Sequence, residues 1–104
     1  MFSAIKKLFG AGPKIDLGEL ISNGAIIIDV RTPAEYASGH LKQAVNIPLS
    51  TLHGRLGKLK KDRPIITCCA SGMRSSSAAS ILKSNGFGQV YNGGNWNSLR
   101  KYEK

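Results

Sequence analysis

The stretch PIITCCASGMRSSS, residues 64–77, begins as an apolar run and ends in small polar residues. Its first half has the β-branched content of a buried strand. The segment SSSAASILKSNG, residues 75–86, starts with serines and ends with a glycine, which is typical of a helix. The adjacent Cys68 and Cys69 therefore fall where the predicted strand passes into a loop that enters the predicted helix.

Further strands and helices alternate on both sides of this unit. The β-branched run AIIIDV, residues 25–30, is typical of a strand buried on both faces of a parallel sheet. Shorter runs predict strands at residues 44–48 and 89–92, and Ile15 is expected in an edge strand. Helices are expected at residues 17–24, 33–38, 49–59 and 95–102, the last after a turn at Gly93-Gly94. This order predicts an α/β fold, an open parallel sheet with helices on both faces and its ligand site at the carboxyl ends of the strands.

The helix expected after residues 25–30 carries a start signal. Thr32 can cap it, Pro33 suits its first position, and Glu35 completes a T-x-x-E capping box. We therefore assign Glu35 to a helix cap. We also expect His40 to hydrogen-bond the backbone.

Length and charge bound the classes of function. A chain of 104 residues has room for one domain. Its 15 Lys and Arg residues against 6 Asp and Glu residues give a net charge of +9, a field that attracts small oxyanions and acidic proteins. Few aromatic residues accompany the basic ones, so we expect no nucleic-acid partner. We expect the densest basic stretch, residues 55–63, to be a loop of solvated lysines and arginines.

The two cysteines are adjacent, which excludes a disulfide framework and does not fit the ligand spacing of a zinc site. Free thiols predict a reducing compartment and therefore a cytoplasmic protein. Residues 1–13 are expected to form an N-terminal extension or short amphipathic segment before a domain at 14–104. Lys6 and Lys7 interrupt any secretion signal, and no run of residues is apolar enough for a membrane span.

The loop after residue 69 has the composition of an anion cradle. A cysteine between a strand and a helix meets free backbone N–H groups and the positive helix end, which lower its pKa and favour the nucleophilic thiolate. Gly72 permits the positive φ of a tight loop, and Arg74 adds a permanent charge. We predict that Cys69 is the nucleophile and that the loop binds the substrate through residues Ala70, Ser71, Gly72, Met73, Arg74 and Ser75.

Two counts of this loop compete. From Cys69 the pattern is C-x-x-G-x-R, whereas from Cys68 it is C-x5-R, the residue count of cysteine phosphatases. In those enzymes the glycine falls three residues after the cysteine and a histidine usually precedes it. From Cys68 the glycine is four residues on, and Thr67 precedes, so the Cys69 count is the better one.

Three segments together resemble the rhodanese-type sulfurtransferases. The loop CASGMRS, residues 69–75, is similar to the active-site loop of that family. IDVRTPAEYASGHLKQAVNIP, residues 28–48, resembles its N-terminal signature, and VYNGGNWNSL, residues 90–99, resembles its closing double-glycine segment. The resemblance implies a five-stranded parallel sheet and no metal or organic cofactor. It also implies a ping-pong reaction, in which Cys69 takes a sulfane sulfur from a small anionic donor such as thiosulfate and passes it to cyanide, a dithiol or a protein thiol.

The resemblance leaves some roles open. It implies that Asp29 and Arg31 brace the site, and a purely structural ion pair is the alternative. Ala70 and Ser71 stand where thiosulfate-preferring members often carry basic residues, which predicts that thiosulfate is a poor physiological donor. Cys68 is either a small buried hydrophobe or a second thiol that attacks a Cys69 persulfide.

Trp96 is expected either to wall the pocket or to belong to the core. A persulfide carrier or docking module for a protein partner remains an alternative to the enzyme. A cysteine phosphatase or arsenate reductase is the less favoured one, because the loop counted from Cys69 is one residue short for a phosphate-sized oxyanion.

Overall fold

The chain folds around one parallel sheet with helices on both of its faces. The computed structural model describes residues 15–103, so the expected extension at residues 1–13 lies outside the described part. The sheet has the strand order β2-β1-β3-β4, and every neighbouring pair is parallel. Its strands are β1 (Ile26–Asp29), β2 (Ala44–Asn46), β3 (Ile65–Cys69) and β4 (Val90–Asn95). The predicted α/β class is confirmed.

The strand count differs from the five that were expected. Ile15 lies outside any strand, and helix α2 (Leu17–Ser22) begins two residues later. Asp16 is the N-cap of this helix, and its side chain accepts a hydrogen bond from the Glu19 N–H at 3.1 Å. Residues 15–103 therefore contribute four strands.

The predicted capping box of helix α3 (Pro33–Ala37) is confirmed. The Glu35 N–H donates to Thr32 Oγ1 at 3.2 Å, and the Thr32 N–H donates to Glu35 Oε1 at 2.9 Å. The helix ends one residue earlier than expected, with Ser38 as its C-cap. The prediction for His40 is also confirmed, because its Nδ1 lies 2.8 Å from the Tyr36 carbonyl oxygen.

The helix expected at residues 49–59 is broken into three short pieces. They are η2 (Leu49–Thr51), α4 (Leu52–Arg55) and η3 (Leu56–Lys58). Gly54 and Gly57 each cost a helix about 1 kcal/mol relative to alanine, which favours such a break. Fully buried Leu52 holds the segment on the sheet.

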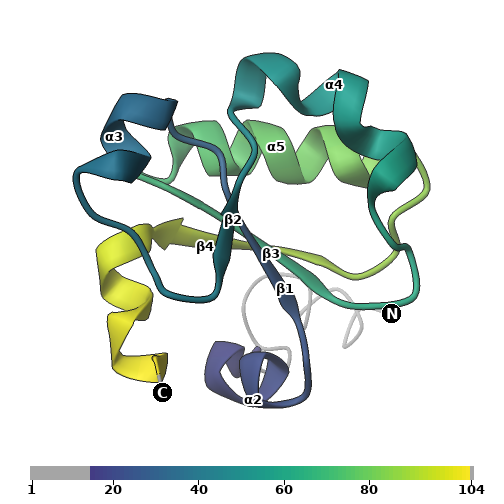
Figure 1. Cartoon of the computed structure of the whole chain (residues 1–104). Helices are drawn as coiled ribbons and strands as arrows, with labels where there is room; N and C mark the ends of the chain where they lie inside the picture. Colours follow the sequence, from purple (N-terminus) through teal and green to yellow (C-terminus); the bar gives the residue numbers. More distant parts are fainter. Residues whose placement is uncertain (1–14, 104) are drawn as a thin grey trace, which may run out of the picture.

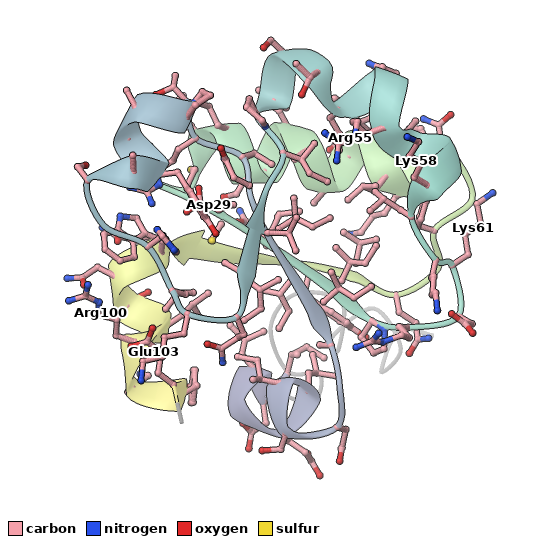
Figure 2. The ribbon with its side chains drawn as sticks, in the orientation of Figure 1. Asp29, Arg55, Lys58, Lys61, Arg100 and Glu103 are labelled. Carbon is pink, nitrogen blue, oxygen red and sulfur yellow. The ribbon has the colours of Figure 1, made fainter. Side chains whose placement is uncertain are left out.

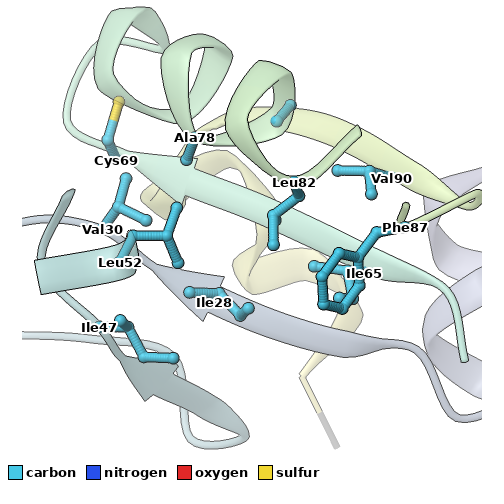
Figure 3. Close-up of a cluster of buried hydrophobic side chains, with 11 residues drawn as sticks. Ile28, Val30, Ile47, Leu52, Ile65, Cys69, Ala78, Leu82, Phe87 and Val90 are labelled. Carbon is cyan, nitrogen blue, oxygen red and sulfur yellow. The ribbon is translucent and has the colours of Figure 1, made fainter. Parts of the chain in front are cut away.

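Alternation along the strands divides the core into two layers. Ile28 and Ile65 belong to one cluster, which packs under helices α4 and α5 (Met73–Ser84), whereas Ile27 and Ile66 belong to the cluster on the other face. Figure 1 shows α4 and α5 on one side of the sheet and α2 with the C-terminal helix η4 (Trp96–Tyr102) on the other. Figure 3 shows the first cluster, with helix α5 above it.

The double glycine does not form the expected turn, because it lies within strand β4. A Cβ on Gly93 would lie 2.8 Å from Ile66 Cγ2 and 3.0 Å from the Thr67 carbonyl oxygen, so only glycine lets the two strands approach this closely. Gly94 has a φ of +76°, and the β3–β4 register shifts between Thr67 and Cys69. The irregularity brings the end of β4 beside the cysteine loop.

Candidate active site

The cysteine loop connects the end of β3 to the start of α5. Gly72 is the N-cap of α5 and has a φ of +101°, which turns the chain sharply into the helix. A Cβ at this position would also lie 3.5 Å from Gly94 Cα, so the loop packs against the irregular end of β4. The prediction that Gly72 supplies a positive φ is confirmed.

The sulfur of Cys69 is buried and faces backbone donors. Its Sγ accepts the Gly72 N–H at 2.9 Å and the Ser75 N–H at 3.4 Å. Figure 3 shows the sulfur turned toward helix α5. Burial raises the pKa of the Cys69 thiol, but hydrogen bonding with the Ser75 side chain and with the amides of Ser75, Gly72 and Ser71 outweighs burial, so the pKa lies below its ordinary value. The loop therefore stabilises the thiolate relative to that of an ordinary cysteine.

Cys68 points to the opposite face of the sheet. It is fully buried in the cluster that contains Ile27 and Ile66, and it pairs with Asp29 across the β1–β3 ladder. Burial, with the Asp29 charge second, raises the pKa of the Cys68 thiol to about 12. Successive side chains of a strand point away from each other, so this geometry favours Cys68 as a buried hydrophobe over attack on a sulfur carried by Cys69.

The other loop residues predicted to bind substrate differ in their exposure and in their distance from the sulfur. Ala70 and Ser71 are exposed, and Met73 has 78% of its surface exposed. Ser75 is fully buried at the sulfur, with Oγ 3.4 Å from Cys69 Sγ. Of the predicted binding side chains, Ser75 is thus the one in direct contact with the thiol.

Arg74 is held by a partner that the sequence did not suggest. Its Nη1 and Nη2 donate to Glu35 Oε1 and Oε2 at 2.7 Å and 3.0 Å, 39 residues away along the chain. Hydrogen bonding from Arg74, aided by the Thr32 N–H, lowers the pKa of Glu35 to about 2. Both groups are therefore charged at neutral pH, and Glu35 offsets the charge of Arg74 that was expected to face an anion.

Asp29 and Arg31 form a buried ion pair on the Cys68 face. The Arg31 Nη2 lies 2.7 Å from Asp29 Oδ2 and also donates to the Gly39 carbonyl oxygen at 2.7 Å. The guanidinium carbon stands 4.5 Å from the Trp96 ring centroid. Asp29 lies inside the molecule in Figure 2, whereas Arg100 and Glu103 lie at its surface. These contacts tie the loop after α3 and the start of η4 to the sheet, and they fit a structural brace better than substrate contact.

Asn92 is the functional candidate that sequence reasoning missed. Its Oδ1 accepts the Ser75 hydroxyl at 2.6 Å, and its Nδ2 donates to the Gly72 carbonyl oxygen at 3.3 Å. The Gly94 N–H donates to the same Oδ1 at 2.9 Å. A polar residue directly before the double glycine was the available signal, but only the fold brings it to the loop.

A hollow of about 310 Å³ adjoins the Arg74–Glu35 pair. Its lining comes from the loop after β1, from η2 with the residue before it, and from α5, namely Val30, Thr32, Pro48, Leu49, Ser50 and Arg74. Val30, which lines the hollow, belongs to the same buried cluster as Cys69. A second hollow, of about 370 Å³, is lined by Ile21, Ala25, Lys42 and Gln43 and includes no loop residue.

Fold and loop together define an α/β domain with a cysteine in an amide cradle. The model of the rhodanese-like domain matches residues 15–96, so the chain belongs to the rhodanese-like family. Thiosulfate sulfurtransferase GlpE of Ectopseudomonas mendocina is 38% identical over 73 residues, which are 70% of this chain and 67% of that protein. The chain spans between about half and two thirds of the length of the curated relatives that head the comparison.

Solved structures that are similar to this chain include members of the same family. A rhodanese with anions from E. coli has 32% sequence identity and a TM-score of 0.67, with 71% of this chain and 89% of that chain covered. The human single-domain sulfurtransferase TSTD1 has 26% identity and a TM-score of 0.69, with 85% and 92% covered. Among residues 15–103, no helix has the length and apolarity that a membrane crossing requires.

Proposed function

We propose that this chain is a sulfurtransferase in which Cys69 carries a sulfane sulfur as a persulfide. The observation that supports this most directly is the buried sulfur at the end of β3, which accepts the N–H groups of Gly72 and Ser75. Such donors stabilise an anionic sulfur without a metal or a second catalytic base. Relatives named as sulfurtransferases support the same reaction class.

In the first half-reaction the Cys69 thiolate attacks the sulfane sulfur of the donor. With thiosulfate, the new bond joins Sγ to the outer sulfur, and the bond between that sulfur and the sulfonate sulfur breaks. Sulfite leaves with the bonding electrons, and Cys69 becomes an anionic persulfide. Charge balances, because one thiolate and one dianion give one persulfide anion and one sulfite dianion. The amides of Gly72 and Ser75 remain in reach of the inner sulfur throughout.

In the second half-reaction an acceptor takes the outer sulfur. Cyanide attacks it, thiocyanate leaves, and the Cys69 thiolate is restored. A dithiol or protein thiolate can do the same, and it would then carry the persulfide away. The lowered pKa of Cys69 favours this step as well, because a less basic thiolate is a better leaving group.

The surroundings of the loop favour donors other than a free dianion. Glu35 pairs with Arg74 through both of its oxygens, and Ala70 and Ser71 bring no charge. The neighbouring hollow is lined in part by Val30 and Leu49. We infer that thiosulfate supports turnover but is a poorer donor than an organic persulfide.

Two other functions make different predictions. A cysteine phosphatase or arsenate reductase would use Cys68 as its nucleophile, and this thiol faces the core with its pKa raised to about 12. A persulfide carrier would take up sulfur on Cys69 but release it only to a protein partner.

Intact mass spectrometry after incubation with thiosulfate, and separately with inorganic polysulfide, tests the proposal. We expect a gain of one sulfur atom in wild type and in Cys68→Ser, no gain in Cys69→Ser, and loss of that sulfur on addition of cyanide. Sulfur uptake that cyanide cannot reverse would favour the carrier. Uptake that persists in Cys69→Ser would contradict the assignment of the nucleophile.

A further inference from the structure

The Ser75 hydroxyl has one proton and two polar neighbours that compete for it. Its Oγ lies 2.6 Å from Asn92 Oδ1 and 3.4 Å from Cys69 Sγ, and the Ser75 side chain is fully buried. A hydroxyl can donate to one partner at a time while it accepts from another. The direction of this proton therefore decides whether the sulfur faces a donor or an acceptor.

The orientation of the Asn92 amide settles that direction in the resting thiol. The Gly94 N–H is a donor and lies 2.9 Å from Oδ1, and the Gly72 carbonyl oxygen is an acceptor and lies 3.3 Å from Nδ2. A flipped amide would place donor against donor and acceptor against acceptor at both contacts. Oδ1 is therefore the atom that faces Ser75, and the Ser75 hydroxyl donates its proton to it.

This arrangement leaves only the lone pairs of Ser75 for the sulfur. They accept the S–H of a neutral Cys69, and they cannot stabilise a thiolate. The Ser75 hydroxyl can lower the pKa of Cys69 only after it turns from Asn92 to the sulfur. The N–H groups of Gly72 and Ser75 need no such movement, because the backbone holds them on the sulfur.

We propose that Asn92 is a positioning residue that holds the Ser75 hydroxyl away from the sulfur in the resting thiol, so that ionisation of Cys69 requires this hydroxyl to turn from Asn92 to the sulfur. The thiol proton leaves to water, and the hydroxyl proton stays on Ser75 throughout. The inference deepens the proposed function and rests on Cys69 as its nucleophile.

The competition has a chemical use. A thiolate that must take its donor from Asn92 is less stabilised than one that meets a free hydroxyl, and a less stabilised thiolate is the stronger nucleophile. Once Cys69 carries the sulfur, its Sγ is no longer charged and Ser75 can return to Asn92. The pair thus raises the free energy of the free thiolate relative to the persulfide, which favours transfer of the sulfur to Cys69 once the thiolate has formed.

The first test measures the ionisation midpoint of Cys69 from ultraviolet thiolate absorbance against pH, with Cys68→Ala as the background for every variant. Asn92→Ala frees the Ser75 hydroxyl, and we expect the midpoint to fall by about one pH unit relative to that background. With Ser75→Ala also present, that fall is expected to disappear. If loss of the Asn92 amide loosens the loop, it does so both with Ser75 present and with Ser75→Ala, so this effect cancels when the two Asn92→Ala shifts are compared. An equal shift with and without Ser75 would overturn the proposal.

Ser75→Ala alone provides a second test that does not depend on the Asn92 variant folding. Removal of the hydroxyl takes a hydrogen-bond acceptor from the thiol and, from the thiolate, a donor that Asn92 also attracts. These two losses oppose each other, so we expect the ionisation midpoint of Cys69 to shift by less than about half a pH unit. A rise larger than about one unit would mean that Ser75 donates to the thiolate without competition, and would overturn the proposal.

Asn97→Ala is the matched control, because it removes the same side-chain amide from an exposed position on η4. We expect no change in the Cys69 midpoint, and circular dichroism of each variant verifies the fold. Sulfur uptake from thiosulfate and inorganic polysulfide is measured on the same proteins. Absence of uptake with the expected midpoint shifts would refute the proposed function and leave the hydroxyl switch standing, whereas normal uptake without the shifts would do the reverse.

Discussion

At the scale of single residues, the two adjacent thiols differ in acidity because they face different surroundings. Cys68 is buried beside Asp29, and its pKa is raised to about 12, whereas an unfolded cysteine ionises near 8.5. The unfolded chain therefore loses this proton first, and stability that is fully present below about pH 8.5 declines as pH rises toward 12. We predict that Cys68→Ala flattens this alkaline decline in urea-unfolding free energies measured between pH 8 and 11. Cys69→Ala should not flatten this decline, because the thiol that it removes has a lowered pKa. An unchanged slope in Cys68→Ala would contradict the assignment.

At the scale of elements, Glu35 joins the start of α3 to the start of α5, because it closes the capping box and pairs with Arg74. Glutamine can also close a capping box, so Glu35→Gln removes the charge and keeps the cap. The pair is half-exposed, so the effect is modest: we predict a rise of about two- to five-fold in kcat/KM for thiosulfate, and little change for an organic persulfide. Glu19→Gln makes the same change of net charge in the first turn of α2 and serves as the control. An equal gain in both variants would assign the effect to net charge alone.

At the scale of the whole molecule, the net charge of +9 should guide anionic donors to the protein. The Debye length falls from about 30 Å at 0.01 M salt to about 8 Å at 0.15 M, so we predict that the second-order rate of sulfur uptake from thiosulfate falls over this range. Stopped-flow measurement of that rate, with neutral iodoacetamide as the matched probe of Cys69 reactivity, checks the prediction. A thiosulfate rate with no more salt dependence than the iodoacetamide rate would contradict it.

Much of the fold was predictable because its signals are local. The β-branched run at residues 25–30, the capping box at Thr32 and the loop glycine at Gly72 each express a preference of a few neighbouring residues, and all three are confirmed. The expected edge strand at Ile15 and the turn at Gly93-Gly94 were wrong. Ile15 is followed at once by the Asp16 cap of helix α2, whereas Gly93 is placed by the close approach of β4 to β3, which no local pattern reports.

The family and the parallel α/β architecture could be predicted from the sequence alone, because motif spacing and hydrophobic periodicity are properties of the linear chain, and the same motif spacing favours Cys69 over Cys68 as the proposed nucleophile. The surroundings of the Cys69 thiol follow from tertiary contacts. The fold directs Cys68 into the opposite layer, occupies Arg74 with Glu35, and brings Asn92 to the Ser75 hydroxyl. These partners are 17 to 39 residues apart in the chain, and they meet because parallel strands align their carboxyl ends at one edge of the sheet.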